Sequence, residues 1–329
     1  SFNFGARNWI VLNRITGLTP TRIEGVVEGR VGGQYGGNIW FSAANGIIFG
    51  KGAQIDAGSI LDIAALADLA HAHKIPLIVD STFATPYLCR PKDHGADIVV
   101  HSLTKFMGGH GNSLGGVIVD CGTYDWLGAG HRYKTMVDAN PSYNGMRLAE
   151  TFGNFAFAIA CRVMGMRDIG PAISPFNAFL LLTGIETLPL RMRAHCENAI
   201  AVAEFLEKHP KVAWVNYAGL PNNPYNAVAR RICPNGAGAV FTFGLKGGYE
   251  DGVAFVKELK LFSHLANIGD TRSLVIHPAS TTHRQLTDAQ RAAAGVGPDV
   301  VRLSIGIEDK ADIIADIAQA LDAPRGTKD

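Results

Sequence analysis

Three short, almost wholly apolar runs constrain the fold of the first half of the chain. They read IPLIVD, ADIVVHS and GGVIVD and occupy 75–80, 96–102 and 115–120. An uninterrupted apolar run of this length is typical of a strand that is covered on both faces by helices. A helical pattern over 60–70, which Ser59 can cap, comes directly before the first run. Helices that alternate with buried strands predict an open, mostly parallel α/β sheet.

The pattern changes in the second half. Between 174 and 206 it is mostly helical, with Pro189 near a predicted kink, and we interpret this stretch as a bridge into a second domain. VAWVNY, AVFTFGLKG and VVRLSIGIE then alternate like strands, while YEDGVAFVKELKLF and DKADIIADIAQALD have the period of amphipathic helices. We therefore predict a large domain over 59–185 and a smaller C-terminal α+β domain over 186–329.

The composition narrows the kinds of partner. Of 329 residues, 47% are apolar, which is enough for two packed domains. Lys and Arg number 30 against 29 Asp and Glu, so no broad field would attract nucleic acid or an acidic membrane. The 5 cysteines are odd in number and widely spaced, which favours a reducing cytoplasm over a disulfide framework or a zinc site. With no apolar run of ~18 residues and no signal-peptide pattern, we expect a soluble protein with a small-molecule partner.

The segment HSLTKFMGGHGNSLGG, residues 101–116, lies where the second strand ends and a loop begins. Ser102 and Thr104 offer hydroxyl groups suited to a phosphate oxygen, and Lys105 offers an amine that can condense with an aldehyde. A single lysine after a strand is most often a solvated surface residue, so the interpretation depends on its neighbours. Five glycines in the segment would let the backbone approach a flat ligand: Gly108, Gly109, Gly111, Gly115 and Gly116.

Asp80 supplies the second part of this pattern. It ends the strand before the one that leads to Lys105, and the carboxyl ends of neighbouring parallel strands share one edge of an open sheet. A carboxylate beside a pyridine nitrogen favours the protonated ring, which then takes up electrons. An acid at a strand end is otherwise often a helix or turn cap. Together with the SxTK segment, Asp80 predicts pyridoxal 5'-phosphate bound as a Schiff base to Lys105.

Two other motifs indicate different chemistry. Residues 111–115 match the G-x-S-x-G nucleophile elbow of α/β-hydrolases, which requires a strand, a turn and then a helix. Here the pentapeptide leads into a strand, which argues against a serine hydrolase. His71 and His73 form an HxH pair, but no third ligand is near in the sequence, and solvated histidines at a helix end are the better account. We therefore predict no metal site.

These segments resemble one known family. HSLTKFMGGHGNSLGG, IPLIVDSTFATPYLCRP, SLVIHPASTTH and VVRLSIGIE together resemble the Cys/Met-metabolism family of fold-type I pyridoxal-phosphate enzymes, over 59–322 almost without interruption. SPFNAFLLLTGIETLPLRM and KLFSHLANIGDTRSLVIHPASTTH are most similar to its homoserine-ester sulfhydrylase branch. The lyase and cystathionine branches usually carry an acid after the GH pair, where this chain has Gly111 and Asn112.

The resemblance implies roles around the cofactor. Lys105 would be the Schiff-base lysine and proton shuttle, and Asp80 would bind the pyridine nitrogen. Thr82 would pack beside the ring, and Tyr35 would stack on it and move protons. The phosphate would be bound by three residues, Ser102, Thr104 and Arg14, of which Arg14 is what remains of the family's tyrosine-arginine phosphate clasp.

The resemblance also implies a substrate site. Arg302 would bind the substrate α-carboxylate through its planar guanidinium, with help from Ser273. Judged only from its position in the sequence, Arg302 would instead form an ion pair on the surface at the end of a strand. Residues 1–58 depart from the family pattern, since Leu12 stands where tyrosine is expected and no serine-glycine phosphate loop is present. We interpret 1–58 as an N-terminal arm and the fragmentary, discontinuous start of the pyridoxal-phosphate domain.

The activity that the resemblance implies is γ-replacement. An O-acylhomoserine, O-acetyl-L-homoserine in the first place, would react with sulfide to give L-homocysteine in methionine biosynthesis. The family forms dimers within tetramers, so a homotetramer is expected. Three alternatives stay open: methionine γ-lyase, cystathionine γ-synthase or lyase, and a non-catalytic relic that binds pyridoxal phosphate. Acetyl or succinyl esters, and sulfide or a thiol, also stay open as substrates.

Overall fold

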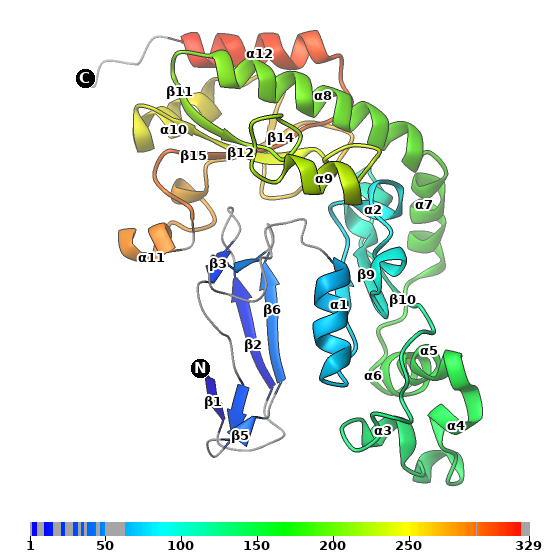
Figure 1. Ribbon diagram of the computed structural model, residues 1–329. Coiled ribbons are helices and arrows are strands. Elements are labelled where there is room, and N and C mark those ends of the chain that lie inside the picture. Colours follow the sequence, from blue (N-terminus) through cyan, green and yellow to red (C-terminus); the bar gives the residue numbers. More distant parts are fainter. Residues whose placement is uncertain are drawn as a thin grey trace. The chain divides into compact units, whose positions relative to one another are not determined.

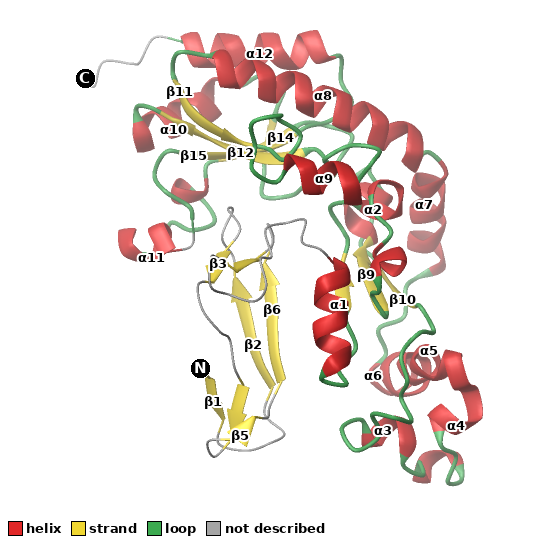
Figure 2. Cartoon of the chain, in the orientation of Figure 1, coloured by secondary structure: helices red, strands yellow, loops and turns green. Residues whose placement is uncertain are grey.

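The computed structural model describes residues 63–293 and 295–323, and of the residues before them only the backbone of seven short strands (Figure 1 and Figure 2). The side chains at 289, 292 and 293 are also outside the description. The chain divides into two compact units, which we call the central unit, Asp62–Met192, and the terminal unit, Ser1–Leu61 with Arg193–Asp329. The predicted domain boundary between 185 and 186 stays a prediction.

The seven strands at the start of the chain pair in three small sheets. β1 is parallel to β4, which is antiparallel to β5, while β2 is parallel to β6 and β3 to β7. Most of these strands have two or three residues, which is too short to show a period in the sequence. Their bounds are β1 Phe2–Phe4, β2 Ile10–Ile15, β3 Thr21–Ile23, β4 Gly29–Val31, β5 Gln34–Tyr35, β6 Asn38–Ala43 and β7 Ile47–Phe49.

The apolar runs of the first half form a three-stranded sheet in the central unit. β8 (Ile78–Asp80) is parallel to β9 (Ile98–Ser102), and β10 (Gly116–Asp120) is antiparallel to β9 on its other side. All three predicted strands are confirmed. β10 is antiparallel because a loop rather than a crossover helix joins it to β9. Helix α1 (Ile63–Ala72) precedes β8 as predicted, and its predicted cap, Ser59, lies outside the described residues.

Short helices that the sequence analysis did not predict follow these strands. α2 (Thr85–Leu88) and the 3-10 turn η1 (Pro91–His94) lie between β8 and β9, and each has a proline in its first turn, where no N–H is needed. After β10, a helical cluster packs around Trp126 and Leu148, next to Ile98 of β9. Its elements are α3 Lys134–Val137, η3 Pro141–Tyr143, α4 Leu148–Phe152, η4 Gly153–Phe155, α5 Ala156–Ala160, η5 Cys161–Met166 and α6 Arg167–Ile169.

The predicted helical stretch is two helices. α7 (Pro175–Glu186) begins at Ser174, whose hydroxyl caps the helix by accepting the Asn177 N–H at 3.2 Å. α7 ends before Thr187, and α8 (Leu188–Lys208) follows at once. Pro189 lies in the first turn of α8, so the predicted kink is a break between two helices.

The terminal unit contains a five-stranded sheet in the order β11-β12-β15-β14-β13, with α8 and α12 along one side of it (Figure 1). Its buried side chains include Phe243, Leu303 and Ile313, all fully enclosed. The predicted strands and helices of this domain are confirmed, whereas β14, within SLVIHPASTTH, was not predicted as a strand. None of the described helices combines the length and apolar character that crossing a bilayer requires. The elements are β11 Val212–Asn216, α9 Asn226–Ile232, β12 Val240–Leu245, α10 Gly248–Glu258, β13 Ser263–His264, β14 Leu274–Ile276, η6 Pro278–Ser280, α11 Asp288–Ala293, β15 Val300–Ser304 and α12 Lys310–Asp322.

Candidate active site

Asp80 and Ser102 lie at the same edge of the central-unit sheet because β8 and β9 are parallel. The register pairs Asp80 with Val100, two residues before Ser102. Thr82 connects the two strand ends: its N–H and its hydroxyl donate to Asp80 Oδ1 at 3.0 and 2.6 Å, and its hydroxyl oxygen accepts the Ser102 N–H at 2.8 Å. One buried threonine therefore fixes both the Asp80 carboxylate and the exit of β9.

Lys105 lies in a tight helical turn, η2 (Leu103–Met107), that directly follows β9. The turn is of the π type, with the Gly108 N–H donating to Leu103 O at 2.8 Å. Inside it, Lys105 has φ −94° and ψ −136°, which is outside the helical region. Single π turns and unusual backbone angles are frequent at functional sites. Because of this kink, the Lys105 backbone does not continue the regular helical path of the turn.

The Thr104 hydroxyl closes the loop that follows. It accepts the Gly115 N–H at 3.1 Å and lies 3.3 Å from Gly115 O, to which it donates. The Ser102 hydroxyl, by contrast, makes no hydrogen bond with the part of the chain that the structure describes. Ser102 is therefore available to a phosphate oxygen as it stands, whereas Thr104 would exchange its long bond to Gly115 O for one. The phosphate role of both residues stays a prediction.

The glycines of this loop serve protein packing at three positions. A Cβ on Gly108 would stand 2.7 Å from Leu181 Cδ2, and one on Gly115 would stand 2.5 Å from Leu181 Cδ1. A Cβ on Gly109, which has φ +76°, would stand 2.2 Å from Arg191 Nη1. Side chains of α7 and α8 therefore occupy the space that a Cβ would fill at these three positions, and the expectation that the glycines admit a flat ligand stays a prediction.

Arg191 is a residue that the sequence analysis did not single out. It is 5% exposed and its guanidinium binds the backbone beside Lys105. A signal was available in the sequence, since an arginine within the apolar run LPLRM must either reach solvent or find buried acceptors.

The two rival motifs have structural explanations. The G-x-S-x-G segment around Ser113 leads into β10, so the helix that a nucleophile elbow requires does not follow. His71 Nε2 forms a hydrogen bond of 2.7 Å with Oδ2 of Asp97, which is buried. Asp97 also accepts the Leu77 N–H at 2.8 Å and the Thr123 hydroxyl at 2.9 Å. His71 lies in the last turn of α1 with its side chain 41% exposed, as predicted for a helix-end histidine, and it also completes the shell of the buried Asp97 carboxylate, a contact that was not predicted.

Arg302 lies in β15 of the terminal unit and is 9% exposed. Its Nη2 donates to Asn267 O at 3.0 Å, and within the described residues it forms no ion pair. Burial lowers the pKa of Arg302 to about 10, so the side chain keeps its charge at neutral pH. The alternative of a surface ion pair is wrong. A buried guanidinium without a carboxylate partner suits an anionic ligand.

The Ser273 side chain is fully enclosed and bound to protein. Its N–H and hydroxyl donate to the two carboxylate oxygens of Glu308 at 2.6 and 2.8 Å, and its oxygen accepts the Gly306 N–H at 2.9 Å. Its role at the substrate carboxylate stays a prediction. The side chains of Tyr35 and Arg14 lie outside the described residues, so their predicted roles also stay predictions.

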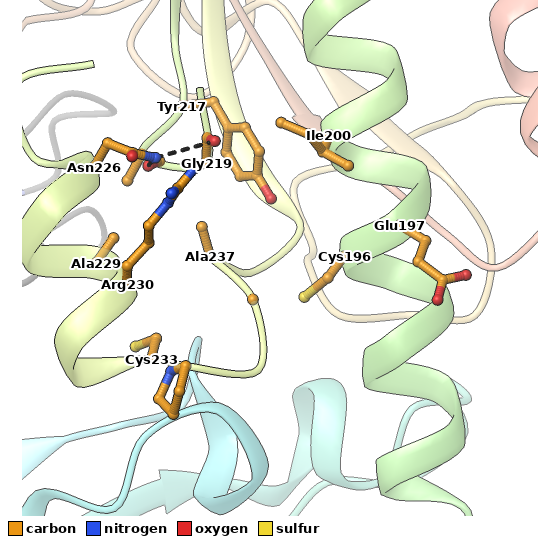
Figure 3. Close-up of a pocket in the computed structure, with 13 residues that line it drawn as sticks. Cys196, Glu197, Ile200, Tyr217, Gly219, Asn226, Ala229, Arg230, Cys233 and Ala237 are labelled. Atoms are coloured by element: carbon orange, nitrogen blue, oxygen red, sulfur yellow. Dashed lines mark hydrogen bonds between the residues drawn. The ribbon is translucent and has the colours of Figure 1, made fainter. Parts of the chain in front are cut away.

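A cavity of about 290 Å³ in the terminal unit contains none of the predicted site residues (Figure 3). Its wall includes Tyr217, whose hydroxyl donates to Gly238 O at 2.8 Å, and Cys196. Burial raises the pKa of the Cys196 thiol to about 11, and a neutral thiol is a poor nucleophile. Cys196 is therefore no candidate for a nucleophile in this cavity.

The fold and the residues at its sheet edge together define a class of protein. The site combines a lysine in a kinked turn after β9, an acid at the end of the parallel strand β8, and hydroxyl groups between them. These are the parts of a fold-type I enzyme that binds pyridoxal phosphate through a lysine. Comparison with protein families gives the same answer. The profile described as Cys/Met metabolism PLP-dependent enzyme matches residues 56–322. The chain belongs to this family.

Several curated proteins are similar to the chain. It is 52% identical over 270 residues to an O-acetyl-L-homoserine sulfhydrylase from Leptospira meyeri, covering 79% of this chain and 61% of that protein. It is also 52% identical over 265 residues to a homocysteine synthase from Schizosaccharomyces pombe, covering 80% of this chain and 62% of that protein. The chain therefore spans less than two thirds of the length of these relatives.

A solved structure is also similar. A protein from Campylobacter jejuni, described as an O-acetylhomoserine (thiol)-lyase, superposes with a TM-score of 0.77 at 32% identity, over 94% of this chain and 78% of that one. Its crystal structure contains a lysine joined to the pyridoxyl phosphate group. The shared fold confirms the predicted fold class, the α/β fold of fold-type I pyridoxal-phosphate enzymes, and among the described strands of the central unit β8 and β9 are parallel while β9 and β10 are antiparallel.

The residues at the sheet edge fit pyridoxal phosphate. Thr82 binds Oδ1 of Asp80, while Oδ2 accepts no hydrogen bond from the described residues and can face a ring nitrogen. The Ser102 hydroxyl, one strand away, can meet a phosphate oxygen. An acid, a hydroxyl and the Lys105 amine are the donor set that this cofactor requires.

Proposed function

We propose that the chain is the catalytic part of a pyridoxal-phosphate-dependent transferase. It would catalyse γ-replacement on O-acetyl-L-homoserine with sulfide, giving L-homocysteine in methionine biosynthesis. The observation that carries the proposal is the placement of Asp80 and of the Ser102–Lys105 segment at the adjacent ends of two parallel strands, linked by Thr82. The names of the similar proteins from Leptospira and Schizosaccharomyces support the choice of substrate and product.

Each residue at the sheet edge has a task in this proposal. When bound, pyridoxal phosphate supplies an aldehyde that carries the amino acid and a ring that takes up electrons. Asp80, oriented by Thr82, holds the proton on the ring nitrogen, because a nearby carboxylate favours the protonated form. Ser102 and Thr104 bind the phosphate. Lys105 binds the cofactor and, once the amino acid displaces it, moves protons at Cα and Cβ so that the γ-acyloxy group leaves and sulfide adds at Cγ.

Arg302 provides the charge for the other end of the substrate. Its buried guanidinium, which forms no ion pair within the described residues, would bind the α-carboxylate through two hydrogen bonds, and Ser273 would support this contact from its Glu308-bound position. Tyr35 would stack on the cofactor ring and move protons, and Arg14 would add to phosphate binding. These assignments imply that the substrate is a small amino acid with a free α-carboxylate.

A product analysis tests the proposed reaction. With O-acetyl-L-homoserine and millimolar sulfide, homocysteine should form far faster than 2-oxobutyrate, and cysteine should replace sulfide poorly. Release of 2-oxobutyrate and ammonia as main products would identify a γ-lyase, and cystathionine formed from cysteine would identify a synthase. A chain that binds the cofactor and yields no product with any of these substrates would be a relic.

The assembly, the location and the domain division are further parts of the proposal. We propose a homotetramer, a dimer of dimers, supported by large apolar side chains on α7 that are 68% and 63% exposed, Phe176 and Phe179. The odd number and wide spacing of the cysteines support a cytoplasmic location. We also keep the division into 1–58, 59–185 and 186–329, in which 59–185 binds the cofactor. Sedimentation equilibrium checks the assembly.

A further inference from the structure

Arg191 is a buried cation in the central unit, and every one of its hydrogen bonds in the described residues ends on a neutral oxygen. Nη1 donates to Phe106 O at 2.6 Å, and Nη2 donates to Met107 O at 3.0 Å and to Gly184 O at 2.6 Å. Nε donates to Thr187 Oγ1 at 3.0 Å. No carboxylate of the described residues pairs with it. The guanidinium is thus held by a cage of carbonyl groups.

Two of the three carbonyl groups that Arg191 binds belong to the residues directly after Lys105, and the third belongs to Gly184 in α7. Two nitrogens of one rigid, planar group fix Phe106 O and Met107 O at the same time, which restrains both peptide planes. Lys105 itself has ψ −136°, so the peptide that leads into Phe106 departs from the helical course. The arginine therefore holds the downstream side of the kink that aims the Lys105 side chain.

The loop and the two helices are shaped to admit this contact. A Cβ on Gly109 would stand 2.2 Å from Arg191 Nη1, so glycine is required on the loop side. A Cβ on Gly184 would stand 2.1 Å from Gly108 O, so glycine is required on the helix side as well. Burial of a charge without a carboxylate is costly, and a neutral residue would fill the same space at lower cost. The cost indicates a task beyond packing.

We propose that Arg191 is a positioning residue for Lys105. By fixing the carbonyl groups of Phe106 and Met107, it holds the kinked turn in the conformation that presents the Lys105 amine to the cofactor aldehyde. The inference deepens the proposed function and rests on it, since Lys105 must first be the residue that binds pyridoxal phosphate. It assigns to Arg191 no contact with cofactor or substrate.

The experiment measures Lys105 reactivity directly. The purified chain is mixed with pyridoxal phosphate and quenched with borohydride at increasing times, and peptide mass spectrometry gives the rate at which the cofactor becomes trapped on Lys105. The variants are Arg191→Met, which removes the charge, and Arg191→Lys, which keeps the charge but has no planar fork to bind three carbonyl groups. Arg193→Met, at an exposed position two residues on, is the matched control. Thr187→Val removes one of the two Arg191 contacts that lie off the loop and keeps the other, to the backbone oxygen of Gly184.

Both Arg191 variants should trap the cofactor on Lys105 about 10- to 100-fold more slowly, because small displacements of a reacting group have effects of this size. Turnover should fall in the same proportion, while the KM for O-acetyl-L-homoserine changes by no more than about twofold. Amide hydrogen exchange of the peptide 103–111 should also rise. Arg193→Met and Thr187→Val should behave like the unaltered chain.

The outcomes separate the two proposals. Trapping at the unaltered rate in folded Arg191→Met or Arg191→Lys would overturn the role of Arg191 and leave the proposed function in place. A Thr187→Val variant as slow as Arg191→Met would also overturn it, because the contact that matters would then lie on the helix. If the unaltered chain itself traps no cofactor on Lys105, the proposed function fails first. If Arg191→Met does not fold, Arg191→Lys decides the question.

Discussion

Thr82 offers the sharpest test of how the sheet edge is built. It is 7% exposed, its hydroxyl donates to Asp80 Oδ1 at 2.6 Å, and the same oxygen accepts the Ser102 N–H at 2.8 Å. Thr82→Val keeps the shape of the side chain and removes both interactions. Thr82→Ser keeps the hydroxyl and removes one methyl group, so the pair of variants isolates the hydroxyl.

The expected loss follows from these two contacts. The hydrogen bond to the exposed Asp80 carboxylate contributes about 1 kcal/mol, and a Ser102 N–H left without an acceptor costs about 1–3 kcal/mol. Thr82→Val should therefore lower the free energy of unfolding by about 2–4 kcal/mol. The methyl group lost in Thr82→Ser accounts for only about 1 kcal/mol.

Urea unfolding of the cofactor-free chain, followed by circular dichroism, measures both variants. The cofactor should also dissociate faster from Thr82→Val than from Thr82→Ser, since Asp80 then loses its hydroxyl donor and keeps only the backbone N–H at position 82. Equal stability of the two variants, within about 0.5 kcal/mol, would show that the hydroxyl bridge between β8 and β9 does not stabilise the sheet edge.

Four further perturbations test the site and its surroundings. Lys105→Ala should lower kcat at least ~10³-fold and abolish the borohydride-trapped adduct, as measured by steady-state kinetics and mass spectrometry. Asp80→Asn should still bind the cofactor but turn over slowly and titrate abnormally in absorbance, because a neutral amide cannot hold the ring proton. Arg302→Lys should lower kcat/KM about 10- to 100-fold, mostly through KM, since the bidentate contact is lost. His277 is fully enclosed, and burial lowers its pKa below the ordinary value of 6.5. The folded state then binds fewer protons than the unfolded chain, so the His277 contribution to stability is complete above about pH 6.5 and is lost as the pH falls below it. In His277→Gln, the urea midpoint should therefore depend less on pH between about pH 7.5 and 5.5 than in the unaltered chain.

The sequence predicted the elements whose signal is local. β8, β9 and β10 are short apolar runs, and Asp80 and Ser102 could be placed at their ends because parallel strands share an edge. The direction of β10 was not available in the same way, since it depends on the loop that returns to β9. β14 was also missed, because three buried residues between a loop and a proline have no period.

The contacts that shape the site join residues far apart in the chain, and composition does not encode them. Arg191 reaches carbonyl groups 84 and 85 residues earlier, and a backbone carbonyl is present at every position. Thr104 binds Gly115 across a loop, so its side chain is partly used within the protein. The contact of His71 with Asp97 was not predicted because Asp97 lies 26 residues away, directly before another strand. In each case the partner is chosen by the fold.

The glycines around Lys105 affect which residues are retained as related proteins diverge. At Gly108, Gly115 and Gly184 a methyl group would meet Leu181 or the loop backbone at 2.7 Å or less, whether or not a cofactor is bound. Selection for a folded chain alone would preserve these glycines in a lineage that had abandoned catalysis, while Lys105 would be free to drift. A conserved glycine-rich loop in a relative would thus show only that the fold is retained. The presence of the lysine would show whether the relative can still catalyse the reaction.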